Sequence, residues 1–353
     1  MRPSEAAACY SGTPVELKLL LKRGALLTAA NWPTVAIQFV ASTTFQVMLA
    51  VPLVGAAILV AILLGADVGN LLQGSLNDVF TNLATALVAE PLALTGFVTA
   101  FAIVLFGGSV LMFAVKGGTI EVLIASNEVA GPIERGPIAW ESVQAISRFT
   151  LPRFMDGCAR LFRRYVILGL ALMLVYGLSG GAYVAFLVYG YHAAGDRILI
   201  LGWAFLGAIA GVGLVAWITA VNLVYLLVQI AVAIEDVGVV EAVRTVARLI
   251  RARGRDLGGV FFVVLVMIVG ATLASALAWS GVGLIAFVPL VGLAVFPLQM
   301  AALVLRGLVY EYISLTALGA YLTVYRRQTE RAGLGMAIKS SETPAAGATA
   351  SLS

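Results

Sequence analysis

The chain is a succession of long apolar runs separated by short basic or polar segments. A transmembrane helix requires about 20 mostly apolar residues, because each residue advances the helix by about 1.5 Å across a hydrocarbon core about 30 Å thick. Six runs reach this length: residues 35–64, 92–115, 166–190, 198–232, 257–279 and a last run that ends near Tyr325. The pattern therefore predicts an all-α fold, a polytopic transmembrane helix bundle of six spans.

Two runs depart from a simple span. The first continues from Val35 to Leu64, which is longer than the apolar part of a secretory signal, so we expect an uncleaved span with a kink at Pro52. The stretch from Val282 to Tyr325 exceeds the length of one span. We predict a short apolar segment around Pro289 at the outer leaflet and then a final helix that begins near Pro297, because proline suits the first turn of a helix.

Lysine and arginine mark one side of the predicted bundle. Of the 22 basic residues, only Arg197 falls in an outer loop and Arg306 in an apolar run. The segment 65–90, between the first two spans, carries three carboxylates and no basic residue. Because cytoplasmic loops retain positive charge, we expect a multi-pass protein of the inner (plasma) membrane with both termini in the cytoplasm.

Composition supports this class and excludes others. The chain is 61% hydrophobic and 11% charged, with a mean hydropathy of +1.02, whereas a soluble domain is about a quarter charged. The basic clusters follow the topology and do not form a nucleic-acid footprint. A single histidine, His192, and two distant cysteines provide neither a metal cluster nor a Ser-His-Asp triad. We therefore expect no enzyme, no metal or other cofactor, and no nucleic-acid partner.

A basic amphipathic helix is predicted over 238–255, between spans four and five. Its apolar residues recur at helical spacing: Val239, Val243, Val246 and Ile250. Its arginines follow the same rhythm around other faces: Arg244, Arg248, Arg251 and Arg255. Such a helix suits the anionic cytoplasmic leaflet, so we predict that these arginines contact anionic lipids; the alternative is a solvated connector with a charged face. A second in-plane helix, of low charge, is predicted over 72–87 on the outer side.

The basic connectors indicate an internal repeat. Trp140–Phe149 resembles Val240–Leu249, with glutamate, valine and arginine at matching positions and an Ile-Glu pair shortly before each. This predicts two parallel units, 92–190 and 198–279, related by an axis along the membrane normal. A chance likeness of two amphipathic helices is the alternative. We treat 1–330 as one transmembrane domain and 331–353 as a disordered cytoplasmic tail.

One family resemblance rests on three features. Ile234-Glu235-Asp236 leads through Glu241-Ala242 to Arg251, an apolar span follows, and the final run closes on Tyr325-Arg326-Arg327. Together these resemble a broad group of poorly characterised prokaryotic six-span membrane proteins, which includes the membrane domain attached to some glycerophosphodiester phosphodiesterases. That group often has Ser-Trp after the Glu-Ala pair, where this chain reads Thr245-Val246-Ala247. The resemblance implies a prokaryotic six-span module without the hydrolase part, and hence without phosphodiesterase activity.

Several polar residues within the apolar runs are candidates for an intramembrane site. Arg306 and Glu311 are about 140° apart on a helix and are poor partners for each other, whereas Tyr310 can offer its ring to Arg306. Asn222 and Gln229 lie seven residues apart, hence on one face of span four. Arg306 marks either a site for an anionic group or a side chain that snorkels to the interface, and the amides serve either interhelical hydrogen bonds or a transport path.

Two function classes remain for this chain. The first is a non-enzymatic structural module, or one that assists a membrane or cytoplasmic protein partner. The second is a small transporter or lipid-handling protein with an intramembrane polar site. A cavity lined by Arg306, Glu311 or Asn222 would favour the second class, and tight apolar packing there would favour the first.

Overall fold

The computed structural model describes residues 17–63, 91–137, 139–194, 197–286 and 289–341. The helices in these ranges are α2 (Leu17–Ala30), α3 (Trp32–Leu63), α6 (Pro91–Val129), α7 (Trp140–Ala145), α8 (Leu151–Ala194), α9 (Arg197–Glu235), α10 (Val239–Ala286) and α11 (Pro289–Ser341). Six of them, α3, α6, α8, α9, α10 and α11, are long and apolar enough to cross a membrane. The predicted all-α fold with six spans is confirmed.

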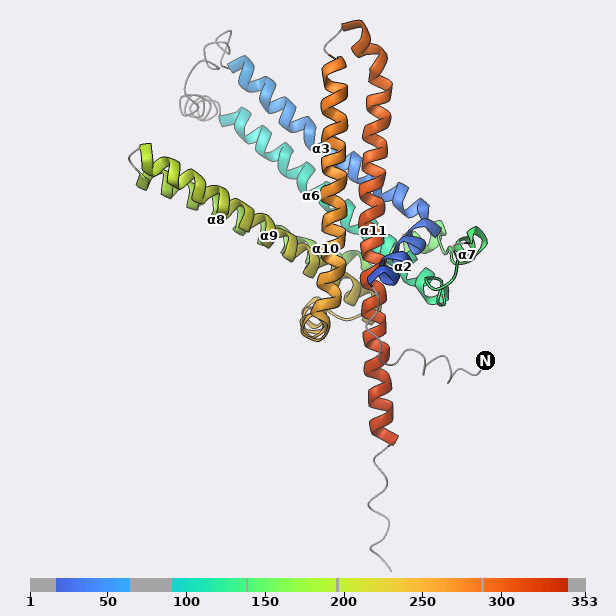
Figure 1. The fold of residues 1–353 in the computed structure, drawn as a ribbon. Coiled ribbons are helices and arrows are strands. Elements are labelled where there is room, and N and C mark those ends of the chain that lie inside the picture. Colours follow the sequence, from blue (N-terminus) through green and yellow to red (C-terminus); the bar gives the residue numbers. More distant parts are fainter. Residues whose placement is uncertain (1–16, 64–90, 138, 195–196, 287–288, 342–353) are drawn as a thin grey trace, which may run out of the picture.

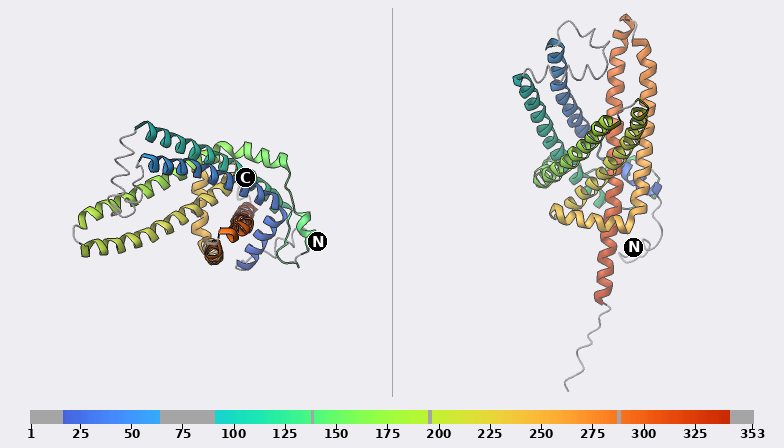
Figure 2. Two further views of the ribbon diagram at one scale, coloured as in Figure 1. Left: turned by 90° about the horizontal axis from the view of Figure 1, so that it is seen from above. Right: turned by 90° about the vertical axis from the view of Figure 1, so that its left-hand side faces the viewer.

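The six long helices form three hairpins, α3 with α6, α8 with α9, and α10 with α11. Figures 1 and 2 show that the hairpins converge at one end and spread apart toward the other. Both arginine-bearing connectors, together with α2 and α7, lie at the converged end, which we call the basic end. The two connectors therefore share one side of the bundle, as the charge pattern requires.

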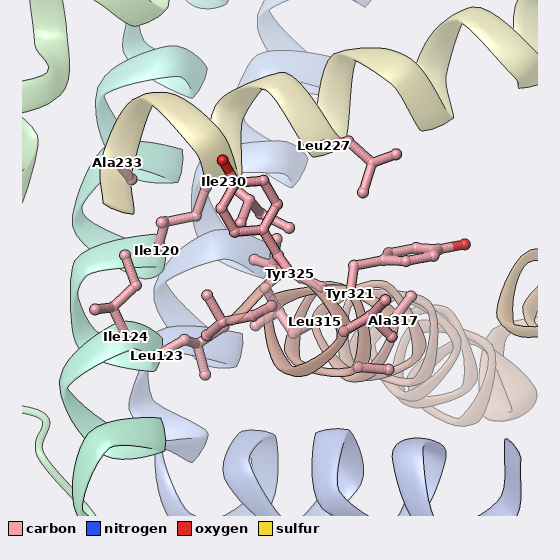
Figure 3. Packing of buried hydrophobic residues seen from close by; sticks show 14 of the residues in the cluster. Ile120, Leu123, Ile124, Leu227, Ile230, Ala233, Leu315, Ala317, Tyr321 and Tyr325 are labelled. Carbon is pink, nitrogen blue, oxygen red and sulfur yellow. The ribbon is translucent and has the colours of Figure 1, made fainter. Parts of the chain in front are cut away.

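The main hydrophobic core lies at the basic end. Figure 3 shows side chains of α6, α9 and α11 in contact there, among them Leu123, Leu227 and Leu315, which are almost fully buried. Toward the spread ends the spans leave large apolar side chains exposed, such as Leu174 and Leu178 of α8. In water such exposure would be costly, whereas in a bilayer these side chains meet lipid.

The predicted basic helix is present as the first part of α10. Arg253 has non-helical angles (φ −131°, ψ 25°), which separate residues 239–252 from the span that follows. In Figure 2 the first part of α10 lies across the basic end and the chain then turns into the long span. However, Ala242, Val246 and Leu249 are buried in the protein core, while Val243 is 44% exposed. The apolar face is therefore occupied mainly by the protein itself, and the predicted stripe was shifted by part of a turn.

The matching connector before span three is shorter. The helix α7 covers only Trp140–Ala145, not the ten residues of the predicted match, and α8 begins at Leu151. The units nevertheless share one feature, because the glutamate of each Ile-Glu pair contacts the same part of α11: Glu134 pairs with Arg327, and Glu235 accepts a hydrogen bond from Tyr325. The repeat itself stays a prediction.

The last helix begins earlier than predicted, although the part of it found apolar enough to cross a membrane is Pro297–Thr329. The helix α11 begins at Pro289, and Pro297 lies inside it, so the segment around Pro289 is the first turns of the same helix. At its other end α11 continues to Ser341, and the first part of the expected disordered tail is therefore helical. The predicted outer helix over 72–87 and the rest of the tail lie outside the described residues.

The helix α2, which the hydrophobic pattern did not predict, packs tightly across α11. Gly24 faces Gly319, and a Cβ built on Gly24 would lie 2.2 Å from the carbonyl oxygen of Thr316 and 2.9 Å from the amide nitrogen of Ala320. Only a residue without a side chain permits this approach of two backbones. The crossing holds the N-terminal helix against the last span.

Candidate functional site

A polar cavity of about 320 Å³ lies where α3, α6, α9 and α11 meet, next to the core. Polar side chains from all four helices line it: Gln38, Lys116, Thr119, Asn222, Tyr225, Gln229, Glu311 and Ser314. Asn222 and Gln229 face the same space, as their spacing predicted, and Glu311 joins them from α11. Three of the five candidate residues are therefore brought together.

Three residues that line the cavity each have a buried polar atom without a hydrogen-bond partner among the described residues. These atoms are Gln38 Oε1, Tyr225 OH and Gln229 Nε2, and each belongs to a side chain that is more than nine-tenths buried. A buried polar atom without a partner costs about 1–3 kcal/mol, so proteins rarely keep one unless water or a ligand satisfies it. Three such atoms at one cavity indicate a place built to receive polar groups.

The cavity also carries both signs of charge. Lys116 of α6 and Glu311 of α11 both line it. Lys116 Nζ lies 5.4 Å from the centre of the Tyr225 ring, a cation–π distance. None of the ion pairs among the described residues joins Lys116 to Glu311. The two charged side chains therefore line the same cavity without forming a direct salt bridge with each other.

The walls of the cavity are fixed by neighbouring hydrogen bonds. Tyr176 of α8 donates to Asn222 Oδ1, and the buried Tyr165 hydroxyl donates to the Gln229 carbonyl oxygen at 2.8 Å. These bonds join α8 to α9 and hold the α9 wall in place. The interhelical role predicted for the amides is thus met by Asn222, whereas the fully buried Gln229 amide nitrogen has no hydrogen-bond partner among the described residues.

Lys116, which the sequence did not single out, supplies the cavity's positive charge. The second span was predicted to end at residue 115, and Lys116 was counted with the basic connector. Instead α6 continues to Val129, so Lys116 lies well inside it. The available signal was the apolar run that resumes after Gly117-Gly118 with Ile120, Val122 and Leu123.

Arg306 and Tyr310 lie at a different place. They line a mostly apolar cavity of about 330 Å³ between α10 and α11. Arg306 stands 5.5 Å from the centre of the Tyr310 ring, which confirms the predicted pairing, and Tyr310 hydrogen-bonds Thr272 at 2.7 Å. The Arg306 side chain is exposed on the surface of the bundle, as expected of an arginine that snorkels. It does not line the polar cavity.

Replacing Arg306 by glutamine is therefore expected to change little. The cation–π contact at an exposed position is worth about 0.5–1 kcal/mol, so the free energy of unfolding should fall by no more than about 1 kcal/mol. Unfolding in mixed detergent micelles measures this change. A loss of several kcal/mol would show that Arg306 is a buried structural charge.

A buried ionic network ties the basic end together. Arg23 of α2 pairs with Glu134 at 2.8 Å and donates from Nε to Asn127 Oδ1 at 2.9 Å. Arg327 of α11 reaches the other carboxylate oxygen of Glu134 at 3.0 Å. Asn31 donates to Ser126 Oγ. One carboxylate thus joins α2, the segment after α6, and the end of α11.

A basic cleft of about 880 Å³ lies between α8 and the first part of α10. Arg163 and Arg164 line it from α8, and Arg244 and Arg248 from α10. Arg251 and Arg255 were also predicted to contact lipid. Both are exposed, but they do not line the cleft. The structure thus divides the four candidate arginines into two pairs.

No group of three or more His, Cys, Asp and Glu residues within the described ranges could hold a metal ion. Comparison of the chain with protein-family models, curated proteins and solved structures finds no match.

Proposed function

We propose that this protein is a small-solute transporter whose substrate site is the polar cavity, and that the substrate is a small zwitterion. The observation that carries the proposal is the meeting of three buried, unpartnered polar atoms with one positive and one negative side chain in a single cavity. Ionisable residues inside membrane helices are costly, and they usually mark substrate or ion paths.

The chemistry of the lining favours a ligand with both charges. A carboxylate would lie at Lys116 and an ammonium group at Glu311, while the amide side chains of Gln38, Asn222 and Gln229 line the same space. A ligand with one charge would leave the opposite side chain desolvated and uncompensated. The cavity volume of about 320 Å³ is roughly that of ten waters and suits a molecule of amino-acid size.

The arrangement of the hairpins supports a transport role. The cavity is lined by α3 and α6 of one hairpin, α9 of the second and α11 of the third. Because the hairpins spread apart away from the basic end, a rocking of one hairpin would change access to the cavity while the core at the basic end stayed packed. The site is placed where relative motion would expose or enclose a ligand.

The other predicted class, a structural or partner-assisting module, is less well supported. Tight apolar packing around Glu311 and Asn222 would have favoured it, and these residues instead line a polar space. The resemblance to the membrane domain of glycerophosphodiester phosphodiesterases, and the placement of the basic end in the cytoplasm of a prokaryotic cell, stay predictions.

Uptake into proteoliposomes tests the proposed function. A mixture of radiolabelled L-amino acids is the probe, and amidated and N-acetylated amino acids, each with one charge removed, are the competitors. We expect the unlabelled zwitterions to compete and the singly charged forms not to. Glu311→Gln and Lys116→Gln should each lower uptake about 10- to 100-fold, because a hydrogen bond to a charged group is worth about 1.5–3 kcal/mol.

Arg306→Gln is the matched control for these variants, since it also removes an intramembrane charge but lies outside the cavity. It should transport at the unaltered rate. If folded protein neither binds nor accumulates any amino acid, or if all three variants behave alike, the carrier proposal is wrong and a structural module becomes the better account.

A further inference from the structure

The basic cleft carries more positive than negative charge, which favours the binding of an anion. Its lining contains four arginines and a single carboxylate, Glu241. Arg164 also pairs with the neighbouring Asp236. After both carboxylates are counted, two positive charges remain in excess within a cleft of about 880 Å³. Guanidinium groups bind phosphate through paired N–H donors, so a phosphate group matches the excess charge and its geometry.

The backbone adds donors on the same side. Gly238 and Val239, at the start of α10, line the cleft beside the arginines. The first amide groups of a helix have no partner within the helix and carry its positive dipole end. They would assist the arginines in holding a phosphate oxygen.

An apolar stripe runs from the cleft along α8. Ile167 lines the cleft one turn beyond Arg163, and Leu170, Leu174 and Leu178 follow at helical spacing. All four apolar side chains are exposed. Ile167 also lies at the start of the apolar run 166–190, just after Arg163 and Arg164, so the stripe follows the arginines into the apolar part of α8. A free phosphate would use only the cleft, whereas a phospholipid would use the cleft and the stripe together.

We propose that this cleft binds the phosphate of an anionic glycerophospholipid, with an acyl chain lying along Ile167, Leu170 and Leu174 of α8. This site is independent of the polar cavity and of the proposed transport function. It replaces the broad contact expected of four arginines by a defined headgroup site that uses Arg163, Arg244 and Arg248. Arg251 lies on the same helical segment and Arg255 just beyond the break at Arg253, and together they serve as a built-in comparison.

Binding of dioctanoyl phosphatidylglycerol to the full-length protein in neutral detergent tests the proposal. The double variant Arg244→Gln/Arg248→Gln should weaken binding at least tenfold, whereas Arg251→Gln/Arg255→Gln, which removes the same charge from the same helix, should change it less than threefold. Dioctanoyl phosphatidylcholine should bind at least tenfold more weakly, since its headgroup has no net charge. The thermal unfolding of lipid-free protein checks that both double variants are folded, and Arg244→Lys/Arg248→Lys should restore most of the affinity.

Two further arms separate lipid from free phosphate. Inorganic phosphate at 10 mM should not displace the lipid, and Leu174→Gln should weaken the lipid without affecting any binding of phosphate. Equal losses in the two double variants would overturn the cleft in favour of diffuse surface attraction. Displacement of the lipid by inorganic phosphate, or unchanged lipid binding by Leu174→Gln, would show that the cleft does not bind a lipid in the proposed way.

Discussion

Replacing Gly24 by alanine is expected to lower the free energy of unfolding by about 3 kcal/mol or more, because the added Cβ would meet backbone atoms that cannot move aside. It would lie 2.2 Å from the Thr316 carbonyl oxygen and 2.9 Å from the Ala320 amide nitrogen. To relieve the overlap, α2 would have to lift away from α11, which would open the core around Leu20 and Leu27. Unfolding in mixed micelles, followed by circular dichroism, measures the loss.

Gly177→Ala is the matched control, because Gly177 lies inside α8 and a Cβ there meets nothing within 4 Å. This substitution should leave stability unchanged or raise it by about 0.5–1 kcal/mol, since alanine restricts the unfolded chain. A Gly24→Ala protein as stable as the unaltered protein would mean that α2 does not cross α11 at this distance.

The six spans could be predicted because a bilayer imposes a strict rule on the backbone. Every amide in the hydrocarbon must be hydrogen-bonded within the protein, so a long apolar run has one solution, a helix that crosses. The same rule says nothing of α2, whose 14 residues are too few to span. Its lysines were taken only as orientation signals, and Arg23, counted with them, is in fact a buried member of the core at the basic end.

The candidate site was predicted in part, since sequence shows which residues are polar but not which faces meet. Asn222, Gln229 and Glu311 stood out within apolar runs and do line one cavity. Arg306 stood out for the same reason but faces outward. The spacing put Arg306 and Glu311 about 140° apart on α11, but it could not show which of the two faces meets α9.

Lys116 and the first part of α10 show the same limit. Lys116 was assigned to a connector because a charge after a run of about 20 apolar residues usually ends a span, yet α6 simply continues. In α10 the amphipathic period was recognised, but a period is equally compatible with a face on lipid and a face on protein. Because Val246 and Leu249 are buried, this face packs against the protein.

Replacing Glu134 by glutamine is expected to cost about 3–5 kcal/mol of stability, because it leaves a buried guanidinium facing a neutral amide. The Glu134 side chain is 1% exposed and that of Arg23 10% exposed, so neither charge can turn to water. The substitution is nearly isosteric, and the loss therefore reports charge and not volume. It should also loosen the end of α11, since Arg327 reaches the same carboxylate.

The pair formed by Arg326 and Glu128 supplies the comparison, because it also joins α11 to α6 but its glutamate is 54% exposed. Glu128→Gln should cost less than about 1 kcal/mol, as surface ion pairs generally do. In a double-mutant cycle, Arg23→Gln and Glu134→Gln should together cost clearly less than the sum of their separate losses, since the double variant leaves neither of these two charges buried without the other. Equal losses for the two glutamates, or additive losses in the cycle, would mean that Arg23 and Glu134 do not form a desolvated pair.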